Sequence, residues 1–466
     1  MTDKTELKWY EKKQGITLRD KQKRLEKKEI RKERRKSSRS EHAEKKASDV
    51  PSKNGTVSFV PKSRIPKVSV AQDSGYLFDI SSIDEKARAI IDDFDSVVSS
   101  IYPLTSKQRA LLPADIRALK HDLTDEREER RVGYMNEKTA LSAYLHYYLW
   151  WNIVRLSRLF ANMPSSFFNL KDGSLALDIG SGPLTVPIAL LLARPELRSK
   201  KITWYCMDIS AQALLSGENI LLATAARLDC EPWKVVRVKG PIGTEIKEKV
   251  DFVSCANVFN EIVQGEQMPP DYLAKKYALQ ILSYIEKKND DSRVLIIEPG
   301  VPACGRFVSL LRSAFMKRSY RIASPCTHCG TCPMDGKRGG KWCNYAFSTE
   351  DAPETLRAFS RDIYIPKERA VLSFIACEKH YVAHGVQEEG RKETHEKPTE
   401  KLTFRVTSDA IRLPGHRTGY YACSSQGLLL VVTESSLKSG ESLSVELQSP
   451  LSAIDEKSGA FLLEIA

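Results

Sequence analysis

Four cysteines lie within eighteen residues of this chain, at Cys326, Cys329, Cys332 and Cys343. The first three stand at two-residue spacing, and glycines in the same stretch let the connecting backbone turn tightly. Thiolates at this spacing can converge on one metal centre without strain, and the run Cys-x-x-Cys-x-x-Cys-Pro is typical of an iron–sulfur loop. The spacing therefore predicts a metal site, with an iron–sulfur cluster favoured over zinc. Buried or disulfide-bonded thiols are the structural alternative.

A second group of residues predicts a nucleotide-type pocket. The segment 175–183 reads as a short apolar strand that ends in Asp178-Ile-Gly180-Ser181-Gly182. Glycines at this point let the backbone approach a ligand closely, and the acid can bind the ligand's amino or carboxylate end through water. Asp208 ends the next apolar strand, where an acid can accept hydrogen bonds from both ribose hydroxyls.

These two features together resemble the class I S-adenosylmethionine-dependent methyltransferases over about residues 166–300. A dinucleotide-binding loop needs a third glycine where this chain has Thr185, so the methyl donor is favoured over NAD. Polar residues at the end of a later strand, Asn257 among them, should lie at the same edge of the sheet. The predicted cofactor-binding residues are Asp178, Gly180, Ser181, Gly182, Asp208 and Asn257.

The chemistry of methyl transfer is less well marked. No Asp/Asn-Pro-Pro-aromatic tetrapeptide follows the fourth strand, where amino-methylating enzymes often hold their target nitrogen. Cys255 lies inside an apolar strand, as a packing residue does. We therefore assign no catalytic residue, and both an active methyltransferase and a catalytically inactive relative remain open.

Composition limits the class of protein. With 41% hydrophobic residues in 466, the chain should form a globular protein of more than one domain, and its net charge of +12 favours a polyanionic partner. Residues 1–50 carry 18 Lys and Arg against 10 Asp and Glu, so they supply eight of those charges. The absence of a long apolar run or a signal-peptide core predicts a soluble, monomeric, cytoplasmic protein with no membrane partner. Acidic residues in the basic arm argue against a mitochondrial presequence, although the mitochondrial matrix is kept as an alternative.

The hydrophobic pattern predicts the elements that position these residues. Residues 1–66 read as a basic arm and linker, and 67–165 as a helical domain. Residues 166–384 alternate short apolar strands with helices, which predicts a doubly wound parallel sheet, with the cysteine-rich insertion at about 320–348. A charged linker over 385–400 leads to a small β module over 401–466. The predicted fold class is therefore α/β: a class I (Rossmann-like) methyltransferase core, a helical domain, a metal-binding insertion and a β module.

The order of these parts resembles the methyltransferase-like proteins of the small ribosomal subunit, which include a mitochondrial assembly factor and its bacterial relatives. The resemblance covers roughly residues 80–435 and includes Cys326-Thr-His328-Cys329-Gly-Thr-Cys332-Pro333 and Trp342-Cys343-Asn-Tyr345. It implies a [4Fe–4S] cluster whose fourth thiolate comes from the C-terminal module. The implied ligands are Cys326, Cys332, Cys343 and Cys423.

The chain departs from that family at Cys329, an extra thiol that is the alternative fourth ligand, with Cys377 a weaker one. The resemblance implies a factor that binds the small ribosomal subunit and its rRNA during assembly. Two other functions stay open: an active rRNA methyltransferase with a structural zinc, and a redox- or iron-sensing protein.

Overall fold

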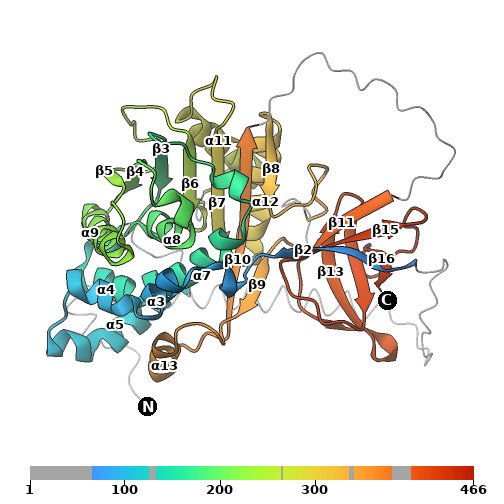
Figure 1. Ribbon diagram of the computed structural model, residues 1–466, viewed down its shortest axis with the longest axis horizontal. Helices are drawn as coiled ribbons and strands as arrows, with labels where there is room; N and C mark the ends of the chain where they lie inside the picture. The colour runs from blue at the N-terminus through green and yellow to red at the C-terminus, as the bar shows by residue number, and fades with distance from the viewer. Residues whose placement is uncertain (1–65, 125–132, 264–265, 335–340, 380–399, 466) are drawn as a thin grey trace, which may run out of the picture. The chain divides into compact units, whose positions relative to one another are not determined.

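The computed structural model describes residues 66–124, 133–263, 266–334, 341–379 and 400–465. The arm predicted over 1–66 and the linker predicted over 385–400 lie outside these ranges, except for residues 66 and 400. Within the described ranges, no helix combines the length and the apolar character that crossing a membrane requires. The described strands form two large sheets (Figure 1).

The first sheet has the strand order β5-β4-β3-β6-β7-β10-β8. Its strands are β3 (Leu175–Ile179), β4 (Thr203–Asp208), β5 (Lys234–Lys239), β6 (Phe252–Ala256), β7 (Arg293–Pro299), β8 (Tyr320–Ser324) and β10 (Arg369–Lys379). The pairs among β3 to β7 are parallel, whereas β10 runs antiparallel to both β7 and β8. A short strand, β9 (Tyr345–Ser348), extends the pairing of β10. This order, with one reversed strand near the edge, is that of a class I Rossmann-like methyltransferase core.

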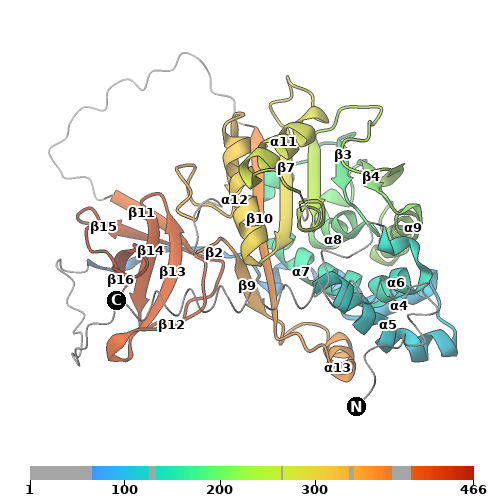
Figure 2. The ribbon, with the colours of Figure 1, turned by 180° about the vertical axis from the view of Figure 1, so that it is seen from behind.

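Two helical layers cover this sheet because alternate strand residues point to opposite faces. One face presents Trp204 and Phe252 to α7 (Leu149–Asn162), α8 (Thr185–Ala193) and α9 (Ala211–Leu228). The other presents Tyr205 and Val253 to α11 (Pro270–Ser283) and α12 (Pro302–Met316). Helices α7 and α8 lie in front of the sheet in Figure 1, and α11 and α12 lie in front of it in Figure 2. The carboxyl ends of the parallel strands are thereby left to form a site.

The N-terminal helices pack into the same hydrophobic core as the sheet and do not form a core of their own. They are α3 (Glu85–Asp92), α4 (Phe94–Ile101), α5 (Ser106–Thr124) and α6 (Lys138–Ala143), followed by a π-helical turn over Tyr144–Tyr148 that leads into α7. The aromatic residues of this turn and of α7 are largely buried; Tyr147 is completely inaccessible and Trp151 is 4% exposed. They are therefore core residues of a helix and not an exposed stacking surface.

The second sheet contains the C-terminal module and two N-terminal strands. Its order is β1-β16-β14-β13-β11-β15-β2, and β12 (Ile411–Arg412) pairs with β13. The strands are β1 (Lys67–Val68), β2 (Val70–Tyr76), β11 (Glu400–Val406), β13 (Thr418–Ser424), β14 (Gly427–Thr433), β15 (Glu441–Leu447) and β16 (Phe461–Ile465). Because β1 and β2 form one extended segment broken only at Ser69, and pair with β16 and β15, the sheet closes on itself.

This closure corrects the boundary predicted at residue 67. Residues 67–76 are extended, whereas sequence reasoning assigned 67–165 to helices. The segment carries Val68 into the core of the closed sheet, beside Leu402, Phe404 and Leu463. Burial of that core therefore requires a strand from the opposite end of the described chain.

Candidate functional site

The predicted glycine loop follows β3 at the carboxyl edge of the first sheet. Gly180 has φ +66° and Gly182 has φ +52°, so both occupy the left-handed region that favours glycine. A Cβ at position 180 would lie 2.5 Å from Val258 Cγ2, which is too close for any side chain. The loop therefore needs glycine at position 180 for its own packing, whether or not it holds a ligand.

Asp178 anchors this loop from beneath. One of its carboxylate oxygens accepts a hydrogen bond from the Ser181 hydroxyl at 2.7 Å, and the other accepts one from the Ser254 hydroxyl at 2.7 Å. Asp178 is only 1% exposed, and this burial raises its pKa to about 7 despite the two hydroxyl donors. In this arrangement the side chain holds β3, β6 and the loop together, and both of its oxygens are already bonded.

Asp208 ends β4 and lies against the same loop. Its carboxylate accepts the backbone N–H of Gly182 at 2.9 Å and the backbone N–H of Ser210 at 2.8 Å. The residue is 6% exposed because the one-turn helix η3 (Tyr134–Asn136) covers this edge. Ser210 Oγ donates to the Met135 carbonyl at 3.2 Å, and the Met135 Cε atom lies 3.5 Å from the position of a Cβ at Gly182.

Met135 was not found by sequence reasoning, because nothing in its local pattern connects it to a loop more than forty residues away. Its thioether side chain lies on the glycine loop and next to the predicted ribose-binding acid. A methyl donor bound in the expected way would occupy this space. The described pocket is therefore closed in this structure by η3.

Asn257 lies at the end of β6 and has φ +58°. Its backbone N–H donates to the Ile297 carbonyl at 2.8 Å, and its side-chain oxygen accepts a hydrogen bond from Arg155 Nη2 at 3.2 Å. Arg155 also donates to Asn152 Oδ1 at 3.1 Å, and burial lowers the pKa of its guanidinium. A basic residue inside the apolar pattern of α7 is the sequence signal by which Arg155 could have been identified.

Glu298, at the end of β7, faces the same edge. Its carboxylate accepts the backbone N–H groups of Val258, Phe259 and Asn260 at 2.7–3.0 Å. The side chain is fully buried, which raises its pKa to about 8. Glu298 thus fixes the start of the short helix α10 (Phe259–Ile262), a structural use of a carboxylate that the sequence suggested only as a pocket residue.

The predicted cysteine ligands come together from two distant parts of the chain. Cys326 follows β8, Cys332 and Cys343 lie between β8 and β9, and Cys423 lies in β13 of the second sheet. Cys332 and Cys423 are 9% and 6% exposed, and both pack with Met334 in one cluster that Cys343 also contacts. Burial and then the neighbouring thiolates of Cys326, Cys343 and Cys332 raise the pKa of Cys423. The four sulfurs therefore lie within electrostatic reach of one another.

Arg312, from α12, supports this cysteine cluster. Its guanidinium donates to the carbonyl oxygens of His328 at 3.1 Å and Gly330 at 2.9 Å, which fixes the loop. Burial lowers the pKa of Arg312, but the thiolates, chiefly that of Cys326, raise it above its ordinary value. A buried cation stabilises thiolate charge, and thiolates are the form that binds metals.

The alternative ligands have different surroundings. Cys329 is exposed, and Cys377 is completely buried within β10. His328 Nε2 lies 3.4 Å from Cys423 Sγ. Among the described residues, no three side chains of His, Cys, Asp or Glu form a group that could hold a metal ion. The cysteine cluster is thus a set of associated thiols whose sulfurs are not arranged around a single ion.

The basic surface expected around this loop is described only in part. Lys337 and Arg338 lie outside the described residues. Arg321 pairs with Glu378 at 2.6 Å, and Lys341 Nζ lies 3.8 Å from the centre of the Tyr421 ring. These two cations are therefore held by neighbouring side chains.

Solved structures similar to this chain are methyltransferases of low identity. An S-adenosylmethionine-dependent methyltransferase from Thiobacillus denitrificans, in complex with S-adenosyl-L-homocysteine, has 13% identity and a TM-score of 0.27, covering 49% of this chain and 91% of its own. A precorrin-6y C5,15-methyltransferase from Geobacter metallireducens has 13% identity and a TM-score of 0.28, covering 47% and 86%. TrmN from Thermus thermophilus has 13% identity and a TM-score of 0.26, covering 48% of each chain.

No curated protein matches the chain. A family model does match: residues 165–388 fit the family described as "Mitochondrial small ribosomal subunit Rsm22". The matched region begins just before β3 and contains the glycine loop, the strand edge with Asn257 and three of the four predicted cysteine ligands. Through this region, the chain belongs to the methyltransferase-like family of the small ribosomal subunit.

Proposed function

We propose that this protein binds rRNA of the small ribosomal subunit during assembly, and that Cys326, Cys332, Cys343 and Cys423 hold a [4Fe–4S] cluster. The association of these four thiols, drawn from the β8–β9 segment and from β13, is the observation that carries the proposal. The family match supports a role at the small subunit. The description of that family also favours the mitochondrial matrix over the cytoplasm predicted from the sequence.

The donor set fits an iron–sulfur cluster by its chemistry. Four thiolates and a buried arginine give a site in which the negative charge of the sulfurs is partly balanced. A cluster of four irons spreads its thiolates farther apart than a single ion does, so associated thiols without a single-ion arrangement suit it better than zinc. When bound, the cluster would supply iron–thiolate bonds between the β8–β9 segment and β13, and its binding free energy would add to that of folding.

The methyl-donor pocket belongs to the same proposal. Asp208 and the loop of Gly180, Ser181 and Gly182 would contact S-adenosylmethionine, while Asp178 would keep the loop in shape from beneath. Asn257 would line the far side of the pocket with Arg155. Because Met135 rests on the loop, the donor can enter only when η3 moves away.

The first test is the iron, sulfide and zinc content and the visible spectrum of protein purified without oxygen. We expect about four irons and four sulfides per chain with broad absorption. Cys332→Ser should lose the cluster and lower the melting temperature, whereas Cys329→Ser, at the exposed extra cysteine, should leave both unchanged. One zinc per chain and no colour, or an unaltered spectrum in Cys332→Ser, would contradict the proposed ligand set.

The ribosomal part of the proposal needs its own measurement. Wild-type protein should co-sediment with small-subunit particles at low salt, and binding should fall steeply as salt is added, because phosphate contacts release counterions. A protein that carries the cluster but never co-sediments would instead support the redox- or iron-sensing alternative.

An active rRNA methyltransferase is the second candidate, favoured by the class I core. Its test is methyl transfer from labelled S-adenosylmethionine to small-subunit rRNA. Gly180→Arg should abolish any transfer, because position 180 has no room for a side chain and needs a positive φ.

A further inference from the structure

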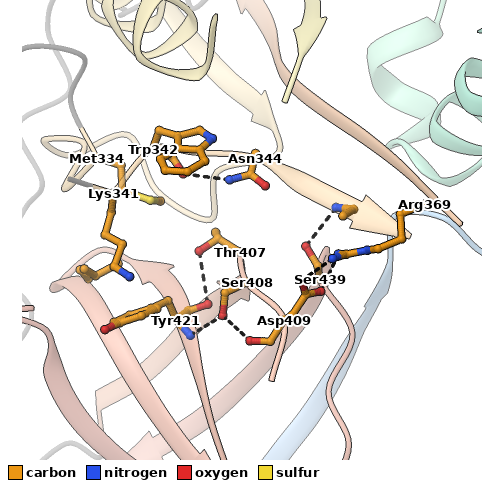
Figure 3. Close-up of a pocket in the computed structure, with 12 residues that line it drawn as sticks. Met334, Lys341, Trp342, Asn344, Arg369, Thr407, Ser408, Asp409, Tyr421 and Ser439 are labelled. Carbon is orange, nitrogen blue, oxygen red and sulfur yellow. Dashed lines mark hydrogen bonds and ion pairs between the residues drawn. The ribbon is translucent and has the colours of Figure 1, made fainter. Parts of the chain in front are cut away.

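A pocket of about 210 Å³ lies beside the cysteine cluster, between the β8–β9 segment and the closed sheet. Trp342 and Asn344 line it from the first side, and Thr407, Ser408 and Tyr421 from the second. Figure 3 shows the two aromatic side chains on opposite sides of the pocket, with Lys341 extending toward Tyr421. Neither the predicted methyl-donor site nor the cysteine ligands include any of these residues.

The two aromatic rings are held in place before any ligand binds. The Trp342 indole N–H donates to the Gly300 carbonyl at 3.0 Å, and a Cβ at Gly305 would lie 2.7 Å from Trp342 Cδ1, so the ring packs closely on α12. The Tyr421 backbone N–H donates to Ser408 Oγ at 2.8 Å. Rings fixed in this way offer stacking surfaces at little entropic cost.

The charges of the pocket favour an anionic ligand. Its one lining acid within the described residues, Asp409, forms a two-point ion pair with Arg369 at 2.5 and 2.6 Å. Lys341 contacts the face of the Tyr421 ring and has no carboxylate partner among the described residues. The carboxylate is therefore neutralised, and a mobile lysine ammonium is left to meet a phosphate.

The size of the pocket selects the class of ligand. Sites for drug-sized molecules typically measure roughly 300–1,000 Å³, so this pocket is too small for a whole methyl donor or a dinucleotide. A single planar base fits its scale. Aromatic rings, an amide, hydroxyls and one cation are also the groups with which proteins bind unstacked RNA bases.

We propose that this pocket binds one unstacked nucleotide of single-stranded RNA, with its base between Trp342 and Tyr421 and its phosphate at Lys341. The proposal rests on the rRNA-binding function proposed above and deepens it. Entry of the base moves the Lys341 ammonium from the Tyr421 ring to the phosphate. Asn344 and the hydroxyls of Thr407 and Ser408 then face the edge of the base.

The test is the affinity of the full-length protein for a labelled ten-nucleotide single-stranded RNA, measured by fluorescence anisotropy. Tyr421→Leu should weaken binding about 10-fold, and Tyr421→Phe should retain wild-type affinity because it keeps the ring. Lys341→Ala should lower the slope of log affinity against log salt by about 0.7, the value for one phosphate contact on a single strand. Lys457→Ala removes the same charge from an exposed position outside the pocket and should change neither quantity.

A second measurement keeps the proposal testable if Tyr421→Leu folds poorly. RNA containing 4-thiouridine should crosslink on irradiation to Trp342 or Tyr421 of the wild-type protein, as identified by mass spectrometry. AMP, CMP, GMP and UMP, each added in excess, separate the two sources of a nucleotide. Displacement of the RNA by one of them at an equal concentration would mean that the pocket takes a free nucleotide, which overturns the RNA assignment.

The remaining outcomes separate the pocket from the function on which it rests. RNA binding that is equal in wild type and in every pocket variant, with crosslinks elsewhere, would overturn the pocket and leave the proposed function standing. A wild-type protein that binds neither the oligonucleotide nor small-subunit particles would overturn both.

Discussion

At the scale of single residues, two buried carboxylates make the stability of this protein depend on pH. Asp178 and Glu298 have pKa values raised by burial to about 7 and about 8. For an acid whose pKa is higher in the folded state, the stabilisation is complete below the unfolded value and is lost as pH rises through the folded one. The free energy of unfolding should therefore fall between about pH 5 and pH 8.

We predict that Asp178→Asn removes part of this dependence. The amide stays neutral at every pH and can still hydrogen-bond both serine hydroxyls. The difference in unfolding free energy between pH 5 and pH 8 should shrink by on the order of 2 kcal/mol, as measured by urea titration at each pH. Glu298→Gln should have a similar effect, whereas Glu231→Gln, at an exposed site, should have none. Parallel pH profiles for all four proteins would contradict the assignment.

At the scale of elements, the first sheet follows from the sequence more directly than the second. The strands β3, β4, β5, β6 and β7 are short apolar runs with helices between them, and the hydrophobic pattern marks them within one or two residues. β8, over Tyr320–Ser324, alternates buried and less buried residues and lacks that continuous apolar signal. The pairing of β2 with β15 depends on contacts across most of the chain, which no local pattern encodes.

The same distinction applies to the candidate site. The spacing of the cysteines predicts a shared centre, and the four thiols do associate. The role of Asp178 as an anchor for Ser181 and Ser254 depends on which strands lie next to β3, and the sequence does not contain that information locally. The cover formed by η3 is invisible for the same reason.

That cover gives the prediction for this scale. Met135→Ala should remove the side chain that rests on Gly182 and so favour the open form of the methyl-donor pocket. If η3 is closed most of the time, the apparent affinity for S-adenosylhomocysteine should rise about 3- to 10-fold, because less binding free energy is spent on opening. Isothermal titration calorimetry measures this directly. Met268→Ala, at a methionine that is 45% exposed, is the control and should bind like the wild type. Weaker binding by Met135→Ala would mean that Met135 is part of the ligand site and not its cover.

At the scale of the whole molecule, the segment 67–76 connects the two sheets. It is the strand that closes the C-terminal sheet, and it leads within a few residues to Leu77 and Phe78, which pack in the core of the first sheet. The Phe78 ring stacks on Phe347 of β9 with centroids 4.7 Å apart. Chain connectivity and packing thus join the two sheets even before any cluster adds its bonds, and we expect them to unfold together.

Val68→Asp tests this coupling. Val68 is 8% exposed within the core of the closed sheet, so an aspartate there would bury a charge without a partner or pull the strand out. We expect a loss of about 3 kcal/mol and a separate, earlier melting transition for the C-terminal sheet, seen by calorimetry. Val70→Asp introduces the same charge two residues away, at a side chain that is 43% exposed, and should cost less than about 0.5 kcal/mol. If Val68→Asp lowers a single transition without splitting it, the two sheets form one cooperative unit that does not depend on this strand, and the cysteine cluster becomes the stronger candidate for what holds them together.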